Sequence, residues 1–419
     1  MAKNDIIHVR IFGKEVGKIG LDIDRGRTSF QYHPDFISQE DHAGIFPSTR
    51  IIRRVPQVQV FDQYNTDTFK SLPPPFADSL PDVFGNTIFK AWLESTGRDH
   101  ITVIEQLAYV ANRGMGAFEY YPSKKLKSHT DIDLYQIIEV LKEVMEKKES
   151  IASHQLDTEG LFNIFRIGTS AGGARPKILI SKHKRTGRII PGDIAHTDDY
   201  DHLLVKLAVE DHYPREIIEY CYYLTAIQTG ISMMDSYLVD DKHFATKRYD
   251  RIDGKKKHVL TTSGITGWDF KSPENSSYEN LFKLCSFLKA PHSQSDQLFR
   301  RMIFNVVFAN TDDHLKNHSF SYDNIEQRWF LSPAYDITFA LNPLTDYKYI
   351  SRALSINSKR RHINIDDVMQ IAEAYTIKNP KRIINEVQDA IPTLQRNLKE
   401  HDIPTRIIEA MLKNIKPLI

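Results

Sequence analysis

The sequence predicts a mixed α+β protein in which most strands lie in the first half and the second half is mainly helical. Over residues 6–34, apolar and polar residues alternate in short runs such as IIHVRIFG and KEVGKIGLDI, which is typical of half-buried strands. Beyond about residue 255, apolar residues recur at helical spacing instead. The length of 419 residues exceeds what one compact core accommodates, so we expect two or three packed units.

Apolar periodicity also places the remaining elements. Helices are expected at 134–149, 214–230, 365–375, 380–399 and 404–414. Strands are expected at 162–168, 176–184 and 201–208, with hairpins over 231–251 and 318–332. Two capping-box patterns, Ser276 with Glu279 and Ser293 with Asp296, predict further helix starts. The expected units are 1–123, 124–250 and 251–419.

The composition excludes several classes of protein. Lys and Arg (55) nearly balance Asp and Glu (54), so no global field marks a nucleic-acid or membrane binder. The N-terminus lacks the apolar stretch of a signal peptide, and no apolar run approaches a membrane span. We therefore expect a cytoplasmic protein. Cys221 and Cys285 form no CxxC pair, so buried free thiols are expected rather than a zinc site or disulfide.

The strongest chemical signal is ANTDDHLKNHSF (309–320) followed by WFLSPAYDI (329–337). Asp312 and Asn317 have the D-x-x-x-x-N spacing of a kinase catalytic loop, in which Asp accepts the hydroxyl proton and Asn holds Mg²⁺. Asp336 follows a short hairpin, where a second Mg²⁺-binding carboxylate is needed. The alternative is that the aspartates cap a turn and Asn317 starts a strand. For the spacing alone the odds are about even, and the later Asp favours the kinase interpretation.

A second signal is Lys206, which interrupts the apolar run LLVKLA. Burying an unpaired ammonium group is costly, so a lysine there needs a partner. A kinase places such a lysine on the ATP phosphates and pairs it with an acid on the following helix. Glu219, 13 residues later, is the candidate acid. An exposed lysine on an edge strand is the alternative.

The third signal is RIGTSAGGARPK (166–177). Gly172 and Gly173 permit a tight loop whose backbone N–H groups can approach phosphates, and Arg175 and Lys177 add positive charge. The segment matches neither common phosphate-loop motif. As a lone loop it is more typical of a hairpin turn.

Together these segments resemble the HipA-type Ser/Thr kinases of bacterial toxin–antitoxin modules. GTSAGGARPK looks like the family's phosphate loop, VKLA its ATP-lysine strand and KRYDR the segment after its hinge. NTDDHLKN and SPAYD look like its catalytic and metal loops, while FADSLPDVFGN (76–86) and NRGMGAFEYYP (112–122) are similar to its N-terminal unit. The resemblance covers nearly the whole chain in the expected order. It implies a protein-kinase-like fold with ATP between a strand-rich lobe and a helical lobe.

The resemblance also implies roles for individual residues. Asp312 would be the catalytic base, Asn317 and Asp336 the Mg²⁺ ligands, and Lys206 the phosphate contact. Ser170 matches a loop serine that such kinases can phosphorylate on themselves, although Thr169 beside it leaves the modified hydroxyl ambiguous. Further positions expected to bind ATP are Gly172, Gly173, Lys177, Glu219, the hinge residues Thr246, Lys247 and Arg248, and His314 and Tyr335. Lys247 stands where some relatives carry an acidic hinge residue.

The implied activity is transfer of the ATP γ-phosphate to Ser or Thr of a protein, which blocks translation. An aminoacyl-tRNA synthetase is the plausible target class. The implied partner is a small helix-turn-helix antitoxin, through which DNA would be contacted indirectly, and no membrane is involved. Two alternatives stay open. The chain could act mainly as a co-repressor that bridges antitoxin dimers on DNA, or it could be a solitary small-molecule kinase, because a fold does not fix the acceptor.

Overall fold

The structure is a computed structural model that describes residues 6–81, 101–122, 138, 175–192, 197–209, 213–347 and 349–418. It divides the chain into two compact units. Unit 1 comprises 1–211, 245–260 and 264–267, and unit 2 comprises 212–244, 261–263 and 268–419. The strand expected at 162–168 lies outside the described residues. So does the helix expected at 134–149, apart from Ile138, which is helical.

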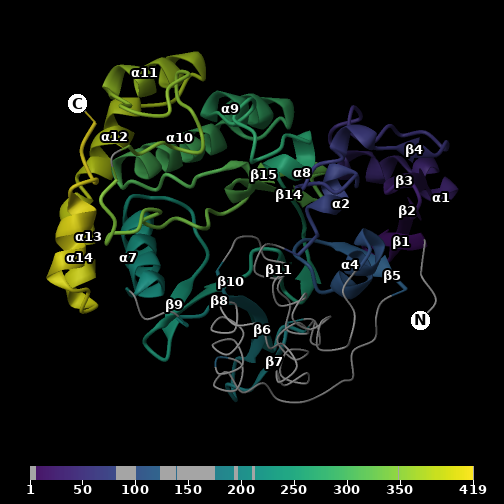
Figure 1. Cartoon of the computed structure of the whole chain (residues 1–419), viewed down its shortest axis with the longest axis horizontal. Coiled ribbons are helices and arrows are strands. Elements are labelled where there is room, and N and C mark those ends of the chain that lie inside the picture. Colours follow the sequence, from purple (N-terminus) through teal and green to yellow (C-terminus); the bar gives the residue numbers. More distant parts are fainter. Residues whose placement is uncertain are drawn as a thin grey trace. The chain divides into compact units, whose positions relative to one another are not determined.

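Unit 1 begins with an antiparallel five-stranded sheet (Figure 1). Its order is β4 (Gln59–Val60), β3 (Arg27–Tyr32), β2 (Lys14–Asp22), β1 (Ile6–Ile11) and β5 (Phe118–Tyr121). Burial alternates strictly along β1, as the sequence pattern predicts for a strand with one buried face. Phe30, Phe76 and Phe118 form the aromatic core of this part, with ring centroids 5.1 Å apart in each adjacent pair.

Short helices accompany this sheet. They are α1 (Pro34–Ser38), η1 (Glu40–Ile45), η2 (Asp62–Tyr64), α2 (Pro74–Ala77) and α4 (Val103–Val110). Thr102 and Glu105 form a complete capping box at the start of α4.

The second sheet of unit 1 carries the predicted lysine strand. Its strands β7 (Ile189–Pro191), β6 (Lys177–His183), β8 (Tyr200–Lys206) and β10 (His243–Lys247) are neighbours in that order, and β10 joins unit 1 at Ala245. The short strands β11 (Arg251–Ile252), β12 (Lys255–Lys256) and β13 (His258–Thr261) follow. The strands expected at 176–184 and 201–208 are therefore confirmed.

Unit 2 is mainly helical, as expected. Its helices are α7 (Arg215–Gln228), α9 (Tyr278–Phe287), α10 (His292–Val307), α11 (Ile365–Ala374), α12 (Pro380–Gln388), α13 (Ile391–Glu400) and α14 (Thr405–Leu412). It also holds β9 (Ser236–Val239) and the hairpin of β14 (Ser319–Asp323) and β15 (Arg328–Leu331), and the unit boundary falls within α8 (Thr262–Thr266). α10 packs against α9 and α12, and α7 packs against α13 (Figure 1).

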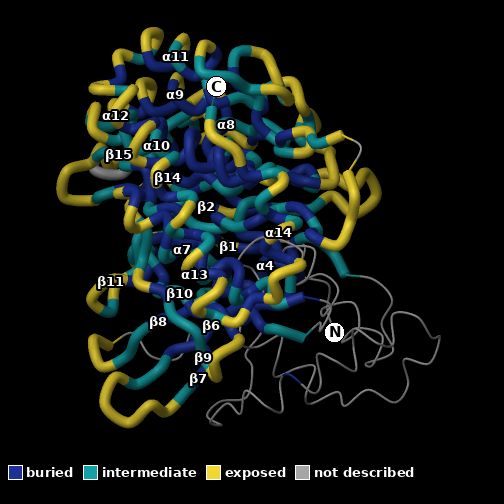
Figure 2. The backbone as a smooth tube through the Cα atoms, turned by 90° about the vertical axis from the view of Figure 1, so that its left-hand side faces the viewer, coloured by how far each residue is buried: buried dark blue, intermediate teal, exposed yellow. Residues whose placement is uncertain are grey.

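Buried residues concentrate in unit 2 along α10 and the adjoining β14 (Figure 2). Phe304 and Phe308 stack with ring centroids 4.2 Å apart, and the Tyr222 hydroxyl donates a 2.7 Å hydrogen bond to the Phe308 carbonyl. Cys221 and Cys285 are buried and free, as predicted, and burial raises the pKa of each thiol to about 12. They are therefore unreactive thiols of the core.

Three predicted helix boundaries are wrong. The capping serine of α9 is Ser277 rather than Ser276, because the Ser276 hydroxyl donates instead to the Ser272 carbonyl at 2.7 Å. α10 begins at His292 after Pro291, so Ser293 lies inside its first turn and does not cap it. The single helix expected over 380–399 is two helices, α12 and α13, because Pro392 has no N–H for a bond to the preceding turn.

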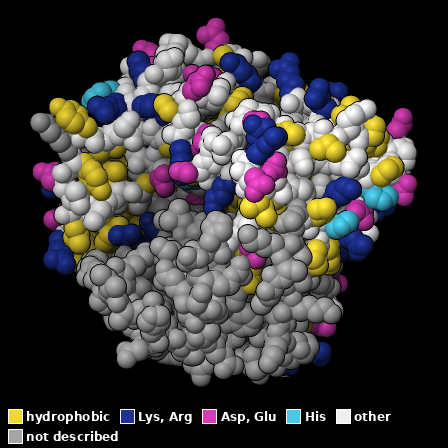
Figure 3. Space-filling view, turned by 45° about the vertical axis from the view of Figure 1, so that its right-hand side comes forward, with side chains coloured by type: hydrophobic (Ala, Val, Ile, Leu, Met, Phe, Trp, Pro, Cys, Tyr) yellow, Lys and Arg dark blue, Asp and Glu magenta, His cyan; other side chains and the backbone are white. Residues whose placement is uncertain are grey.

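The charges on the surface agree with the composition. On the face drawn in Figure 3, Lys and Arg side chains lie among Asp and Glu and do not gather into one field. Among the described residues, no helix has the length and apolar character needed to cross a membrane.

Candidate active site

The predicted catalytic loop begins where α10 ends. Ala309 has φ +55°, a left-handed conformation that reverses the chain directly after the helix. The loop closes with the 3₁₀ turn η5 (Leu315–Asn317), and β14 starts two residues later. A rigid helix on one side and a strand on the other therefore fix this short loop.

The predicted metal loop follows β15. The Ala334 N–H donates a 2.8 Å hydrogen bond to the Ser232 carbonyl, which ties the loop to the segment after α7. Asp336 has φ +53°, a left-handed conformation that Asp tolerates better than most residues. The Tyr335 hydroxyl donates to the Lys316 carbonyl at 2.7 Å, so the metal loop is also fastened directly to the catalytic loop.

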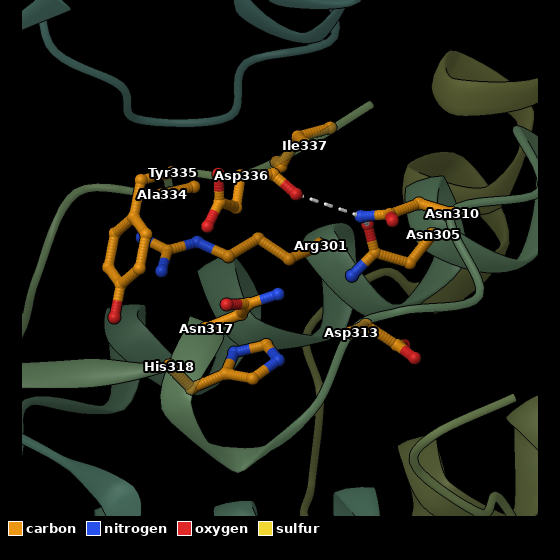
Figure 4. A pocket seen from close by; sticks show the side chains of 10 residues that line it. All are labelled: Arg301, Asn305, Asn310, Asp313, Asn317, His318, Ala334, Tyr335, Asp336 and Ile337. Atoms are coloured by element: carbon orange, nitrogen blue, oxygen red, sulfur yellow. Dashed lines mark hydrogen bonds between the residues drawn. The ribbon is translucent and has the colours of Figure 1, made fainter. Parts of the chain in front are cut away.

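These two loops and α10 surround one pocket of unit 2 (Figure 4). Its lining residues are Arg301, Asn305, Asn310, Asp313, Asn317, His318, Ala334, Tyr335, Asp336 and Ile337. Three of them, Asn317, Tyr335 and Asp336, are among the residues that the sequence predicts to bind ATP or Mg²⁺. The predicted metal ligands, 19 positions apart in sequence, thus line the same pocket.

Asp312 and His314 lie beside the pocket rather than among its lining residues. Asp312 is exposed, and its backbone carbonyl accepts a 2.7 Å hydrogen bond from the Asn317 side-chain amide. The ring of His314 lies 4.9 Å from the ring of Phe270. The Asn317 bond fixes the two ends of the D-x-x-x-x-N segment relative to each other.

Two lining side chains, one arginine and one histidine, are the groups of the pocket that can carry positive charge. Arg301 is 4% exposed and donates to the Ser332 carbonyl at 2.7 Å; in Figure 4 its side chain runs between Asp336 and Asn317. His318 is buried, and that burial lowers its pKa to about 4. At neutral pH the imidazole is therefore uncharged, and the guanidinium group supplies the positive charge.

The donor atoms fit a hard cation. The Asn317 amide N–H group is engaged by Asp312, which directs the amide oxygen away from that bond, and Asp336 contributes a carboxylate to the same pocket. Oxygen ligands of this kind suit Mg²⁺. The described residues contain no group of three or more His, Cys, Asp or Glu that could hold a metal, as a zinc site would require.

Unit 1 holds the predicted phosphate lysines. Lys177 in β6 and Lys206 in β8 are direct cross-strand partners, 3% and 7% exposed. Glu219 is 2% exposed in α7 of unit 2. Because the two residues belong to different units, the Lys206–Glu219 pair stays a prediction. Ser170, Gly172 and Gly173 lie outside the described residues.

The predicted hinge residues differ in burial and in the groups they contact. Lys247 is half-buried, with its ammonium 3.8 Å from the Asp201 carboxylate, and Thr246 before it is also half-buried. Arg248 is 3% exposed; its N–H donates to the His202 carbonyl at 2.9 Å and its guanidinium to Asp250. The Arg248 backbone N–H is therefore already engaged, and its guanidinium group is buried against Asp250.

Comparison with known proteins identifies the family. The model of the HipA-like C-terminal domain matches residues 169–394, more than half of the chain, and that of the HipA N-terminal domain matches residues 7–121. This chain belongs to the HipA family. Membership of this kinase family implies protein kinase activity and use of ATP. No curated protein sequence matches the chain.

Solved structures show the HipA fold. HipA of Shewanella oneidensis MR-1, solved with HipB and operator DNA, has a TM-score of 0.63 at 15% identity, covering 98% of this chain and 96% of that one. The mixed α+β, kinase-like fold expected from the sequence is thereby confirmed. The Helicobacter pylori proinflammatory kinase CtkA also matches, over 52% of this chain and 88% of its own, at 14% identity. Its TM-score of 0.33 supports no inference.

The sequence interpretation missed several residues of the pocket, notably Arg301 and Asn305. Both lie on the buried face of α10, four residues apart and therefore on one side of the helix. Two polar residues at that spacing within an otherwise apolar stretch are a detectable signal of a buried polar site. Asp313 gave no separate signal, because it adjoins Asp312 and one of the two could simply be solvated.

Proposed function

We propose that this HipA-family chain is an ATP- and Mg²⁺-dependent Ser/Thr protein kinase and the toxin of a toxin–antitoxin module. The observation that carries the proposal is the convergence of Asn317 and Asp336 in one pocket, with Asn317 bonded to the backbone of Asp312. A carboxylate, an amide oxygen and a second carboxylate are the groups that a kinase needs for the metal and the acceptor.

In this mechanism Asp312 accepts the proton of the acceptor hydroxyl as the γ-phosphate is transferred. Its exposure lets a protein substrate reach it. Asn317 and Asp336 hold Mg²⁺, which when bound neutralises negative charge on the phosphates. Arg301, buried beside both ligands, adds positive charge to the same pocket.

Lys177 and Lys206 support phosphate binding in unit 1. Lys177 and Lys206 lie directly opposite each other on neighbouring strands and so place two positive charges side by side. Such a pair suits an anionic ligand such as a triphosphate. Gly172 and Gly173 would supply backbone N–H groups to the same phosphates.

Ser170 is proposed as the site of autophosphorylation. A phosphate there adds a charge of about −1.5 to −2 at neutral pH, which repels the ATP phosphates. Modification would therefore weaken nucleotide binding and switch the kinase off. Mass spectrometry after incubation with Mg·ATP distinguishes Ser170 from Thr169.

The proposed partner is a small helix-turn-helix antitoxin, with DNA contacted through it. The support is the HipA structure from Shewanella oneidensis, which contains HipB and operator DNA. The same observation favours a second candidate function, in which the chain is a co-repressor and catalysis is secondary. In both cases the protein acts in the cytoplasm. An aminoacyl-tRNA synthetase is the proposed class of protein substrate.

The proposal is tested with purified chain, γ-labelled ATP and a cell lysate. We expect label on Ser or Thr of a discrete protein, transfer that stops when EDTA removes Mg²⁺, and no label with Asp312→Asn. Label only in small molecules would replace the protein-kinase proposal with a small-molecule kinase. No transfer by folded wild-type protein, together with tighter operator binding by an antitoxin in its presence, would favour the co-repressor.

A further inference from the structure

A buried ion pair of unit 2 adjoins the candidate active site, because its carboxylate belongs to Asp313, which lines the pocket. The Asp313 carboxylate accepts 2.6 Å hydrogen bonds from the Arg352 guanidinium and from the Tyr278 hydroxyl. The three residues are 1%, 7% and 0% exposed. Burial, reinforced by the Asp313 charge, raises the pKa of Tyr278 well above its usual value, so the hydroxyl remains a donor.

The cluster joins segments that are distant in sequence. Asp313 belongs to the catalytic loop, Tyr278 opens α9, and Arg352 lies between the metal loop and α11. Arg352 also donates to the backbone carbonyls of Asn305 and Asn310, each at 3.3 Å. One guanidinium fork therefore holds the end of α10, the start of the loop and the Asp313 carboxylate.

Hydrogen bonds of two side-chain amides extend the cluster to the metal loop. Asn305 donates to the Tyr278 hydroxyl at 2.9 Å and accepts from the Asn310 amide at 3.0 Å. The Asn310 amide also donates to the Asp336 backbone carbonyl at 3.3 Å (Figure 4). Asn310, two positions before Asp312, is thus hydrogen-bonded to the backbone of Asp336, the predicted metal ligand.

We propose that Arg352 and Asp313 are positioning residues that hold the catalytic loop and Asp336 in register before the nucleotide binds. The inference rests on the proposed kinase function. A buried ion pair adds little net stability compared with well-packed apolar residues, because both charges must be desolvated. Its value here is geometric: the planar fork of arginine makes several directed bonds at once, which the single ammonium of lysine cannot.

The test compares three conservative variants in the full-length chain. Arg352→Lys keeps the charge but loses the fork, and Tyr278→Phe removes one hydroxyl. The matched control is Tyr375→Phe, which also removes one hydroxyl of unit 2; that hydroxyl donates to the Glu279 carbonyl at 3.0 Å and not to Asp313. Thermal unfolding establishes that each variant is folded at the assay temperature.

We expect Arg352→Lys to lower kcat about 100-fold, as displacement of a reacting group by about 1 Å does, while KM for ATP changes little. Tyr278→Phe should lower kcat less, and Tyr375→Phe should leave it unchanged. Without nucleotide, hydrogen exchange of backbone amides at 311–317 should quicken in Arg352→Lys, while the amides of α11–α14 keep their protection.

Either of two results in these variants would overturn the inference: wild-type kcat in folded Arg352→Lys and Tyr278→Phe, or unchanged exchange at 311–317 in Arg352→Lys. Equal losses in Tyr375→Phe would also overturn it, because the effect would then be general destabilisation. Failure of the kinase proposal itself gives a different result in the transfer assay, because Asp312→Asn would then transfer phosphate at the same rate as wild type. Hydrogen exchange at 311–317 does not depend on transfer, so it would still show whether Arg352 holds the loop.

Discussion

Replacing Asp250 with Asn is expected to destabilise unit 1 strongly. The Asp250 carboxylate is fully buried and accepts from Arg248 at 2.8 and 2.9 Å, from Arg251 at 2.7 Å and from the Gly116 N–H at 2.8 Å. Both guanidinium groups also donate to the Gly114 carbonyl. The carboxylate therefore joins the segment after β10 to the loop before β5.

The magnitude follows from the two charges that would be left behind. Removing one partner of a buried ion pair costs about 3–5 kcal/mol, and Asp250 neutralises two arginines whose side chains are each 1% exposed. Burial alone would raise the pKa of Asp250, but Arg248 and Arg251 hold it well below its usual value. A lowered folded-state pKa gives stability that is complete above the unfolded pKa and is lost only in strong acid. The difference between variant and wild type should therefore be constant from pH 6 to 8.

The assay is urea-induced unfolding followed by circular dichroism. Asp253→Asn is the matched control, because Asp253 is exposed in the nearby turn between β11 and β12, and it should change the free energy of unfolding by less than about 0.5 kcal/mol. Asp250→Asn should also weaken ATP binding, because Arg248 ends the predicted hinge. A loss of stability below about 1 kcal/mol would refute this reasoning, since it would show that the two guanidinium groups do not depend on this carboxylate.

Three further predictions concern the lysine pair, the phosphate loop and a buried histidine. Lys206→Ala should weaken ATP binding, and adding Glu219→Ala should cost less than it does in wild type; strictly additive losses in a double-mutant cycle would contradict the pairing. Ser170→Ala should stay active longer in Mg·ATP, and calorimetry should show weaker ATP binding by the phosphorylated wild type; equal affinities would argue against charge-based inactivation. Burial lowers the pKa of His258 from 6.5 to about 4, so wild type should lose about 3 kcal/mol of stability between pH 6.5 and 4 through this group. His258→Gln, which can still donate to the Ile45 carbonyl that His258 Nε2 contacts at 3.1 Å, should lack that component in urea titrations at several pH values.

The sequence predicted those elements well whose periodicity and end signals lie within the element itself. The helix expected at 214–230 is α7 (Arg215–Gln228), because its periodicity and end signals all lie within the segment. One helix start was wrong where a tertiary contact accompanies the competing local bond. Ser276 looks like a cap, yet its carbonyl accepts from Arg360, 84 residues away, and Ser277 caps α9 instead.

The same distinction applies to the candidate site. Asn317 and Asp336 could be found from short spacings, because each lies on a loop with a recognisable pattern. Arg352 could not, because its partner Asp313 is 39 residues away and nothing in SRALSIN marks a buried guanidinium. Lys206 was correctly expected in a buried strand, but its cross-strand position opposite Lys177 depends on a register that the sequence does not specify.

The rate of γ-phosphoryl transfer from Mg·ATP in single-site variants tests the central claim most directly. Asp312→Asn should lower the rate about 10²- to 10⁴-fold as expected for loss of a general base, and Asp336→Asn at least as much. Asp402→Asn is the control, because Asp402 is exposed in unit 2 and has φ +56°, close to the +53° of Asp336. All three variants should show wild-type circular dichroism. Transfer at the wild-type rate by folded Asp312→Asn or Asp336→Asn would contradict the assignment of this pocket as a kinase active site.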